Sequence, residues 1–84
     1  AEWLAASPIT GFGVETVGID AGQAARLDPP FPVHHHLLGA DKYGLTQLQS
    51  LDRLPHTGAL LVVSPLRIVG GTGSPARVSA FVPA

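Results

Sequence analysis

The segment at residues 31–48 most constrains the fold, because it predicts a helix followed at once by a strand. The fixed φ of Pro32 suits a first helical turn. A short helical run follows at residues 34–38, and Gly39 is placed to cap it. Residues 43–48 are predicted as a strand. The segment therefore predicts a compact α/β unit in the middle of the chain.

The same segment carries three adjacent histidines, His34, His35 and His36. Successive side chains on a helix point about 100° apart, so the three rings are not expected to ligate one metal ion. If the segment were extended, His34 and His36 would share a face, but two histidines need further ligands. The only nearby acid, Asp41, lies in a predicted turn. A structural or surface role is favoured for the triplet, and one histidine facing a site is the alternative.

The rest of the chain is punctuated by Gly and Pro into short elements. We predict a helical piece at residues 1–6, strands at 14–19, 59–63 and 76–82, a helical turn at 49–53, and loops at 21–30 and 69–75. The run at 59–63 is nearly all apolar, which is typical of a strand buried on both faces. The fold class is therefore α/β, with a mixed sheet and one short internal helix.

Two loops have alternative interpretations. The loop at residues 21–30 is either a surface excursion or a flap over a site. The glycine-rich loop at 69–75 lacks the Lys of a phosphate-binding loop, and no helix pattern follows it, so a simple connection is favoured. Ser64 and Ser74 each precede a proline and lie outside a Gly-x-Ser-x-Gly elbow, so no serine nucleophile is indicated.

Charged residues are scarce, at 13% of the chain against about 25% in typical globular domains. Because the chain has no Cys, it has neither disulfides nor thiolate metal ligands. A surface buried against another chain, or against a missing part of this one, explains the composition better than a merely Ala- and Gly-rich protein. We therefore expect a homo-oligomer or association with an amino-terminal half.

Several partners are disfavoured by the same composition. The net charge is −1 and no basic residues cluster, which argues against nucleic acid and anionic membranes. The longest apolar run, at residues 59–63, is far shorter than the about 20 residues of a membrane span. No secretory signal pattern is recognised, so we expect a cytoplasmic protein.

Five segments together resemble the carboxy-terminal part of the cyclase family, the metal-dependent hydrolases related to kynurenine formamidase. The resemblance runs across most of the chain. The segments are Val17-Gly18-Ile19-Asp20, Phe31-Pro32-Val33-His34 with Leu37-Leu38-Gly39-Ala40, Leu51-Asp52-Arg53-Leu54-Pro55, Leu61-Val62-Val63-Ser64-Pro65-Leu66-Arg67-Ile68 and Gly70-Gly71-Thr72-Gly73-Ser74-Pro75-Ala76-Arg77-Val78. Their order and spacing make the match more specific than any single motif. The resemblance implies that residues 1–84 form one cyclase-like domain, the carboxy-terminal portion of a swivelling β/α/β fold.

The resemblance also implies Zn or Mn chemistry on an amide bond, with metal-activated water as the nucleophile. The family's main ligands come from a His-x-Gly-Thr-His-x-Asp type of motif, which this sequence lacks. The histidine of the second half matches His34, which becomes the candidate catalytic and metal-facing residue. The family's Glu, twelve residues further on, falls at Thr46. Since a catalytic His normally needs an acidic partner, the chain alone is expected to be inactive. A non-catalytic, self-associating scaffold that retains the fold is the alternative.

Overall fold

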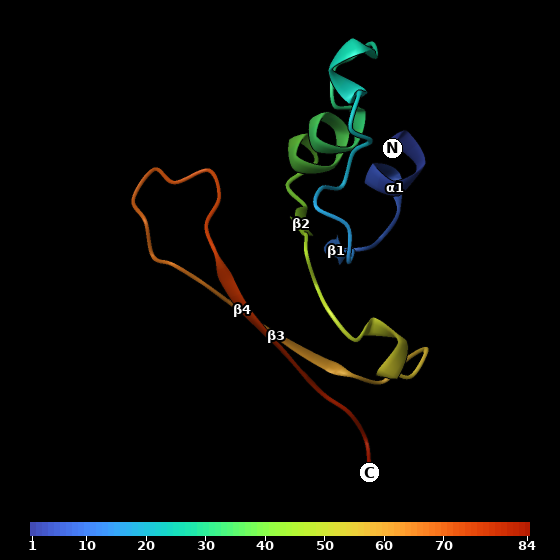
Figure 1. Ribbon diagram of the computed structural model, residues 1–84, viewed down its shortest axis with the longest axis vertical. Coiled ribbons are helices and arrows are strands. Elements are labelled where there is room, and N and C mark those ends of the chain that lie inside the picture. Colours follow the sequence, from blue (N-terminus) through green and yellow to red (C-terminus); the bar gives the residue numbers. More distant parts are fainter. The chain divides into compact units, whose positions relative to one another are not determined.

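The computed structural model describes all 84 residues and divides them into two compact units, Ala1–Gln49 and Ser50–Ala84 (Figure 1). The first unit contains a parallel strand pair and the second an antiparallel pair. The elements are α1 (Glu2–Ala6), β1 (Gly11–Gly13), η1 (Ala24–Arg26), η2 (His34–Leu38), β2 (Tyr43–Leu45), η3 (Leu51–Arg53), β3 (Leu60–Pro65) and β4 (Ala76–Phe81). The predicted α/β class with mixed pairing is confirmed, although the strands lie in two separate sheets. No helix is long and apolar enough to cross a bilayer.

In the parallel strand pair of the first unit, the backbone of β1 lies very close to β2. Gly11 lies opposite Tyr43, and a Cβ atom added to Gly11 would come within 2.6 Å of the Tyr43 ring and carbonyl oxygen. Only a glycine fits this position. The strand predicted at residues 14–19 is wrong, because the residues that pair are Gly11–Gly13. Backbone proximity, rather than β-branched side chains, determines where this strand forms.

The second strand of the pair ends earlier than the predicted residues 43–48. β2 stops at Leu45, and Gln47 has a left-handed φ of 59° that bends the chain out of the ladder. The backbone N–H of Gln47 still bonds to the Thr16 carbonyl oxygen, at 2.9 Å. Thr46 consequently lies just beyond β2, half-buried, between the ordered strand and this bend.

The small core of the first unit lies under the helix η2. Leu37 and Ala24 are the only fully buried apolar residues. The carbonyl oxygen of Ala24 accepts a hydrogen bond from the backbone N–H of Phe31 at 3.0 Å, which folds the 21–30 loop back toward the helix. The helix predicted at residues 34–38 is confirmed and its C-cap is Gly39, but its hydrogen bonding is π-helical. Such single π turns occur frequently at functional sites.

The Lys42 ammonium group connects two segments of the first unit that are distant in the sequence. The Lys42 Nζ donates hydrogen bonds to the carbonyl oxygens of Ser7, at 3.0 Å, and Ile9, at 2.6 Å. Ser7 ends α1, and its hydroxyl donates to the Leu4 carbonyl oxygen at 2.6 Å. The Lys42 side chain thus joins the end of α1 to the start of β2.

The second unit is a hairpin whose strands β3 and β4 pair from Leu60↔Phe81 to Pro65↔Ala76. Both strands were predicted in place, and Pro65 occupies the last position of an edge strand, where a missing N–H does least harm. The unit contains no buried residue. The run at 59–63 was predicted to be buried on both faces, whereas Leu60, Leu61 and Val62 are 64%, 44% and 42% exposed in this chain.

Candidate functional site

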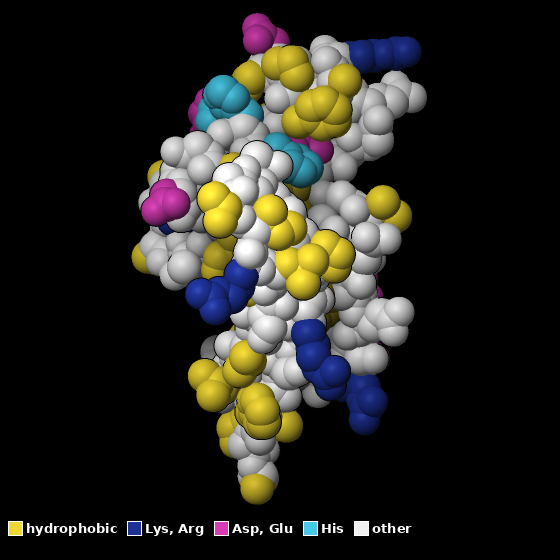
Figure 2. Space-filling view, turned by 90° about the vertical axis from the view of Figure 1, so that its left-hand side faces the viewer, with side chains coloured by type: hydrophobic (Ala, Val, Ile, Leu, Met, Phe, Trp, Pro, Cys, Tyr) yellow, Lys and Arg dark blue, Asp and Glu magenta, His cyan; other side chains and the backbone are white.

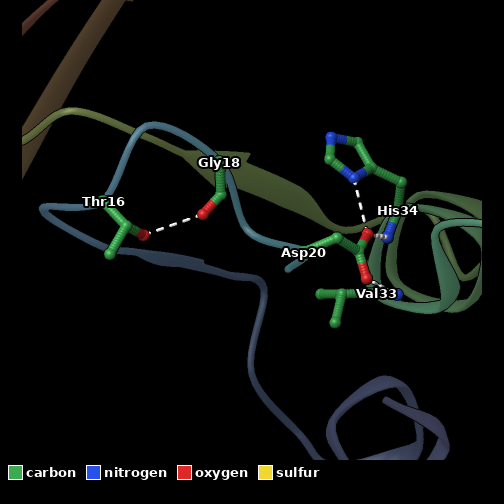
Figure 3. A network of polar contacts seen from close by, with 5 residues as sticks. All are labelled: Thr16, Gly18, Asp20, Val33 and His34. Atoms are coloured by element: carbon green, nitrogen blue, oxygen red, sulfur yellow. Dashed lines mark hydrogen bonds and ion pairs between the residues drawn. The ribbon is translucent and has the colours of Figure 1, made fainter. Parts of the chain in front are cut away.

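The candidate site is a carboxylate–imidazole pair formed by Asp20 and His34 (Figure 3). His34 is the first residue of η2, and its Nδ1 lies 2.7 Å from the Oδ2 of Asp20. The side chain of Asp20 is only 5% exposed, whereas that of His34 is 47% exposed. The pair therefore joins a buried acid to a half-exposed ring, with His34 providing the accessible chemistry.

Asp20 is held in place by the chain on both sides of it. Upstream, the Thr16 hydroxyl donates to the Gly18 carbonyl oxygen at 2.8 Å and closes the turn that leads into Asp20 (Figure 3). Ile19 packs against β2 at Gly44, where an added Cβ would lie 3.0 Å from the Ile19 side chain. The approach of this segment to the start of η2 thus depends on a turn and on a glycine in the neighbouring strand.

The Asp20 carboxylate also accepts two backbone hydrogen bonds at the start of η2. Its Oδ1 accepts from the Val33 N–H and its Oδ2 from the His34 N–H, both at 2.9 Å. These are N–H groups of the kind that a helix start leaves without an intrahelical partner. Asp20 therefore acts as a capping group supplied from a distant part of the sequence, and the same carboxylate binds the His34 ring.

The surroundings of Asp20 favour its ionised form. Burial raises the pKa of its carboxyl group, but the backbone N–H groups of His34 and Val33 and the His34 ring lower it, and the net pKa lies below its ordinary value. The hydrogen bonds stabilise the negative charge more than burial destabilises it. An ionised carboxylate only accepts hydrogen bonds, so it has a defined effect on the ring beside it.

The other two histidines do not join this pair. His35 is exposed and meets the His36 ring edge-on, with 5.0 Å between centroids. The Nε2 of His36 lies 3.8 Å from a carboxylate oxygen of Glu2, which is itself 85% exposed. The helix therefore gives each of the three rings different surroundings, and only His34 has a short bond to a buried acid.

The residues present do not make up a metal site by themselves. No group of three or more His, Asp and Glu side chains lies close enough to hold a metal ion. The carboxylate oxygens of Asp20 are already engaged in three hydrogen bonds. On His34, only the ring nitrogen Nε2 makes no contact with this carboxylate. A catalytic zinc usually takes three protein ligands. This chain offers fewer, so no reaction step through a metal follows from its residues alone.

The acidic partner of His34 comes from an unexpected place. The sequence pointed to residue 46, where the chain has Thr46, whereas the structure brings Asp20 to the ring. Asp20 belongs to a segment that carried the family resemblance, but nothing in the spacing of the acids marked it as a partner. It lies fourteen residues before His34, across a loop. Only the folding of the 21–30 loop brings the two side chains together.

No protein-family profile matches the chain, but individual proteins do. It is homologous to hydrolases of the cyclase family, over their carboxy-terminal part. Isatin hydrolase of Roseibium aggregatum is 48% identical over 82 residues, which are 98% of this chain and 31% of that protein. The chain thus spans about a third of the length of this relative.

Two solved structures share the fold as well. Isatin hydrolase A from Ralstonia solanacearum is 47% identical, with a TM-score of 0.89 over 98% of this chain and 32% of its own. Isatin hydrolase A from Labrenzia aggregata, bound to benzyl benzoate, is 60% identical, with a TM-score of 0.80 over 87% of this chain and 28% of its own. The likeness therefore covers both the sequence and the backbone of the segment that holds the Asp20–His34 pair.

Proposed function

We propose that these residues form the carboxy-terminal portion of a metal-dependent hydrolase that opens a cyclic or formyl amide such as isatin. The observation that carries this proposal is the His34 ring at the start of η2, bound to a buried carboxylate, in a chain 47–60% identical to solved isatin hydrolases. His34 is the site-facing residue, as a proton acceptor or as one ligand of Zn or Mn.

In this proposal the chain is inactive by itself. It contains no His-x-Gly-Thr-His-x-Asp type of motif, and its side chains form no cluster that could hold a metal ion. The remaining ligands are supplied by sequence that corresponds to the other two thirds of the relatives. Thr46 at the position of the family's Glu leaves Asp20 as the acid that supports His34.

The hairpin supports the proposal of a partner surface. Alternation along paired strands places Leu61 and Val63 with Ala80 and Val78 on one face. This face has only apolar side chains, and the second unit buries no residue beneath it. A two-stranded hairpin is marginally stable at best in water. We propose that the hairpin is covered either by the amino-terminal portion of a cyclase-like hydrolase or by a second copy of this chain.

A second candidate function is a non-catalytic scaffold that associates through this surface. The observation in its favour is the number of large apolar side chains that the second unit exposes, between 42% and 103% of their area. They are Leu60, Leu61, Val62, Leu66, Ile68, Val69, Phe81 and Val82. Figure 2 shows hydrophobic side chains, in yellow, at the surface of the chain. A scaffold requires the surface and does not require His34.

Fragment complementation tests the enzyme proposal against the scaffold. The 84-residue chain is mixed with the amino-terminal two thirds of the Roseibium aggregatum relative and with Mn²⁺ or Zn²⁺, and isatin ring opening is followed by absorbance. We expect turnover only when both parts are present, with loss of turnover in His34→Ala. His35→Ala is the matched control, because His35 is exposed and lies outside the pair.

Other results of this experiment contradict the proposal. Turnover by the 84-residue chain with metal alone contradicts its inactivity in isolation. A complex that forms by light scattering but shows no turnover supports the scaffold instead. A complex in which His34→Ala is as active as the unmodified chain removes His34 from the site.

A further inference from the structure

We propose that Asp20 is a positioning residue that fixes the neutral tautomer of His34, with the proton on Nδ1 and the lone pair on Nε2. This inference rests on the proposed function for the role of His34 in a reaction, but its geometry belongs to this chain alone. It assigns to Asp20 a task that the family resemblance does not supply.

The first argument is the chemistry of the two bonded atoms. The contact between Nδ1 of His34 and Oδ2 of Asp20 is 2.7 Å, a short charge-assisted hydrogen bond. An ionised carboxylate has no proton to donate, so the proton of this bond belongs to the ring nitrogen. A neutral imidazole carries one proton, and Nε2 is therefore left as an acceptor.

The second argument is that the carboxylate is held by other groups and is not free to adapt. Oδ1 accepts from the Val33 N–H and Oδ2 from the His34 N–H, each at 2.9 Å. Rotation of the carboxylate would break both bonds, and its 5% exposure leaves little water to replace them. The Asp20 carboxylate is thus aligned by backbone groups as well as by the ring.

The third argument is that the ring itself is restrained. The Oδ2 of Asp20 binds both the backbone N–H and the Nδ1 of the same residue, His34. This double attachment limits the rotation of the His34 side chain about its first two torsions. Phe31 meets the ring edge-on, with 6.2 Å between centroids and 83° between planes. The ring is therefore held with its Nδ1 edge toward Asp20.

The consequence concerns what His34 binds. The half-exposed part of the ring offers a lone pair rather than an N–H, so its partner must be a hydrogen-bond donor or a cation. A water molecule, an amide N–H of a small substrate and a divalent metal ion all satisfy this requirement. A carbonyl oxygen does not. In the proposed hydrolase His34 therefore begins the reaction as a proton acceptor or ligand, and not as a proton donor.

Nuclear magnetic resonance tests this inference on the chain itself. Long-range ¹H–¹⁵N correlation distinguishes a protonated ring nitrogen from one with a free lone pair, and the loss of one ring's signals in His34→Gln assigns His34. For the neutral ring, we expect a protonated Nδ1 and a bare Nε2 on His34. The exposed His35 is the internal control and should show an ordinary tautomer mixture. A mixture at His34, or a proton on its Nε2, overturns the inference.

Asp20→Asn gives a second readout. Its amide oxygen can keep the bond to the Val33 N–H, with the NH₂ group facing His34, or it can keep the two bonds to His34, with the NH₂ group facing the Val33 N–H. In the first orientation the NH₂ group donates to the ring, and the ring proton moves from Nδ1 to Nε2. In the complemented hydrolase, the same variant should lower kcat by about 10²- to 10⁴-fold, the usual contribution of general acid–base catalysis, with KM changed little. A ring proton that moves to Nε2 in Asp20→Asn while kcat stays unchanged contradicts the inference.

The two proposals fail separately. A protonated Nδ1 together with failed complementation refutes the hydrolase function and leaves the tautomer assignment intact. Turnover in the complemented protein together with a tautomer mixture at His34 refutes the role of Asp20 and leaves the hydrolase function intact.

Discussion

Replacing Asp20 with Ala is expected to destabilise the first unit strongly, because it removes the acceptor of three hydrogen bonds at once. Hydrogen bonds to charged groups contribute about 1.5–3 kcal/mol each. The His34 ring and backbone N–H are exposed and regain water, so their loss counts for less. The Val33 N–H is partly buried and loses its partner. The expected loss is about 2–4 kcal/mol in total.

This loss is large beside the stability available to the unit. Native proteins hold about 0.05–0.15 kcal/mol per residue, which gives roughly 2–7 kcal/mol for the 49 residues of the first unit. Asp20→Ala is therefore expected to leave much of this unit unfolded at room temperature. Asp20→Asn, which keeps one acceptor, should lose about half as much.

Urea denaturation followed by far-ultraviolet circular dichroism measures the change. Native-state hydrogen exchange at the amides of Val33 and His34 reports it locally, since both lose their acceptor. Asp28→Ala is the matched control, because it removes the same charge from an exposed position; surface changes of this kind stay within about 0.5 kcal/mol. An Asp20→Ala chain no less stable than Asp28→Ala would refute the reasoning.

Three further predictions concern pH, packing and association. Folding lowers the pKa of Asp20, so the contribution of Asp20 to stability is fully present above its unfolded-state pKa of about 3.9. This contribution is lost as the pH falls through the folded-state pKa. Acid titration should show this loss in the unmodified chain and not in Asp20→Asn. Gly11→Ala should cost about 1–3 kcal/mol through a clash with Tyr43, whereas Gly39→Ala, which meets nothing within 4 Å, should be neutral in urea denaturation. Leu61→Lys should weaken self-association or complex formation, measured by light scattering.

Each of these has a result that contradicts it. Parallel acid-stability curves for the unmodified chain and Asp20→Asn would show that Asp20 does not carry the dependence. Equal stability of Gly11→Ala and Gly39→Ala would mean that the backbone approach at β1 is not tight. Unchanged assembly of Leu61→Lys would remove the apolar hairpin face from the interface.

The sequence predicted correctly those helices and strands whose position is determined by neighbouring residues. Pro32 and Gly39 bounded η2 correctly, and the apolar run before Pro65 located β3. β1 was missed because its glycines are selected by the approach of Tyr43, which is distant in sequence. β2 was extended too far, since no side-chain pattern indicated the left-handed φ of Gln47.

The sequence also predicted only one of the two residues of the candidate site. His34 was identified through the family resemblance, and its place at the start of a helix followed from local signals. Its partner Asp20 was not, because the contact depends on a loop whose fold is set by Ala24 and Phe31 rather than by any motif. The strand at 59–63 shows the converse: its composition indicates burial, yet Leu60, Leu61 and Val62 are exposed in this structure.

The hydrogen bonds of Lys42 have a consequence for how the site opens. Its Nζ joins the carbonyl oxygens of Ser7 and Ile9, so the chain between them and Lys42 forms a closed loop that contains both Asp20 and His34. The pairing of β1 with β2 begins at the same point. We expect a segment fastened in this way to open as one cooperative unit rather than by fraying from an end. The amides of the Asp20–His34 pair should then exchange with solvent together with those of β2, at a common free energy of opening.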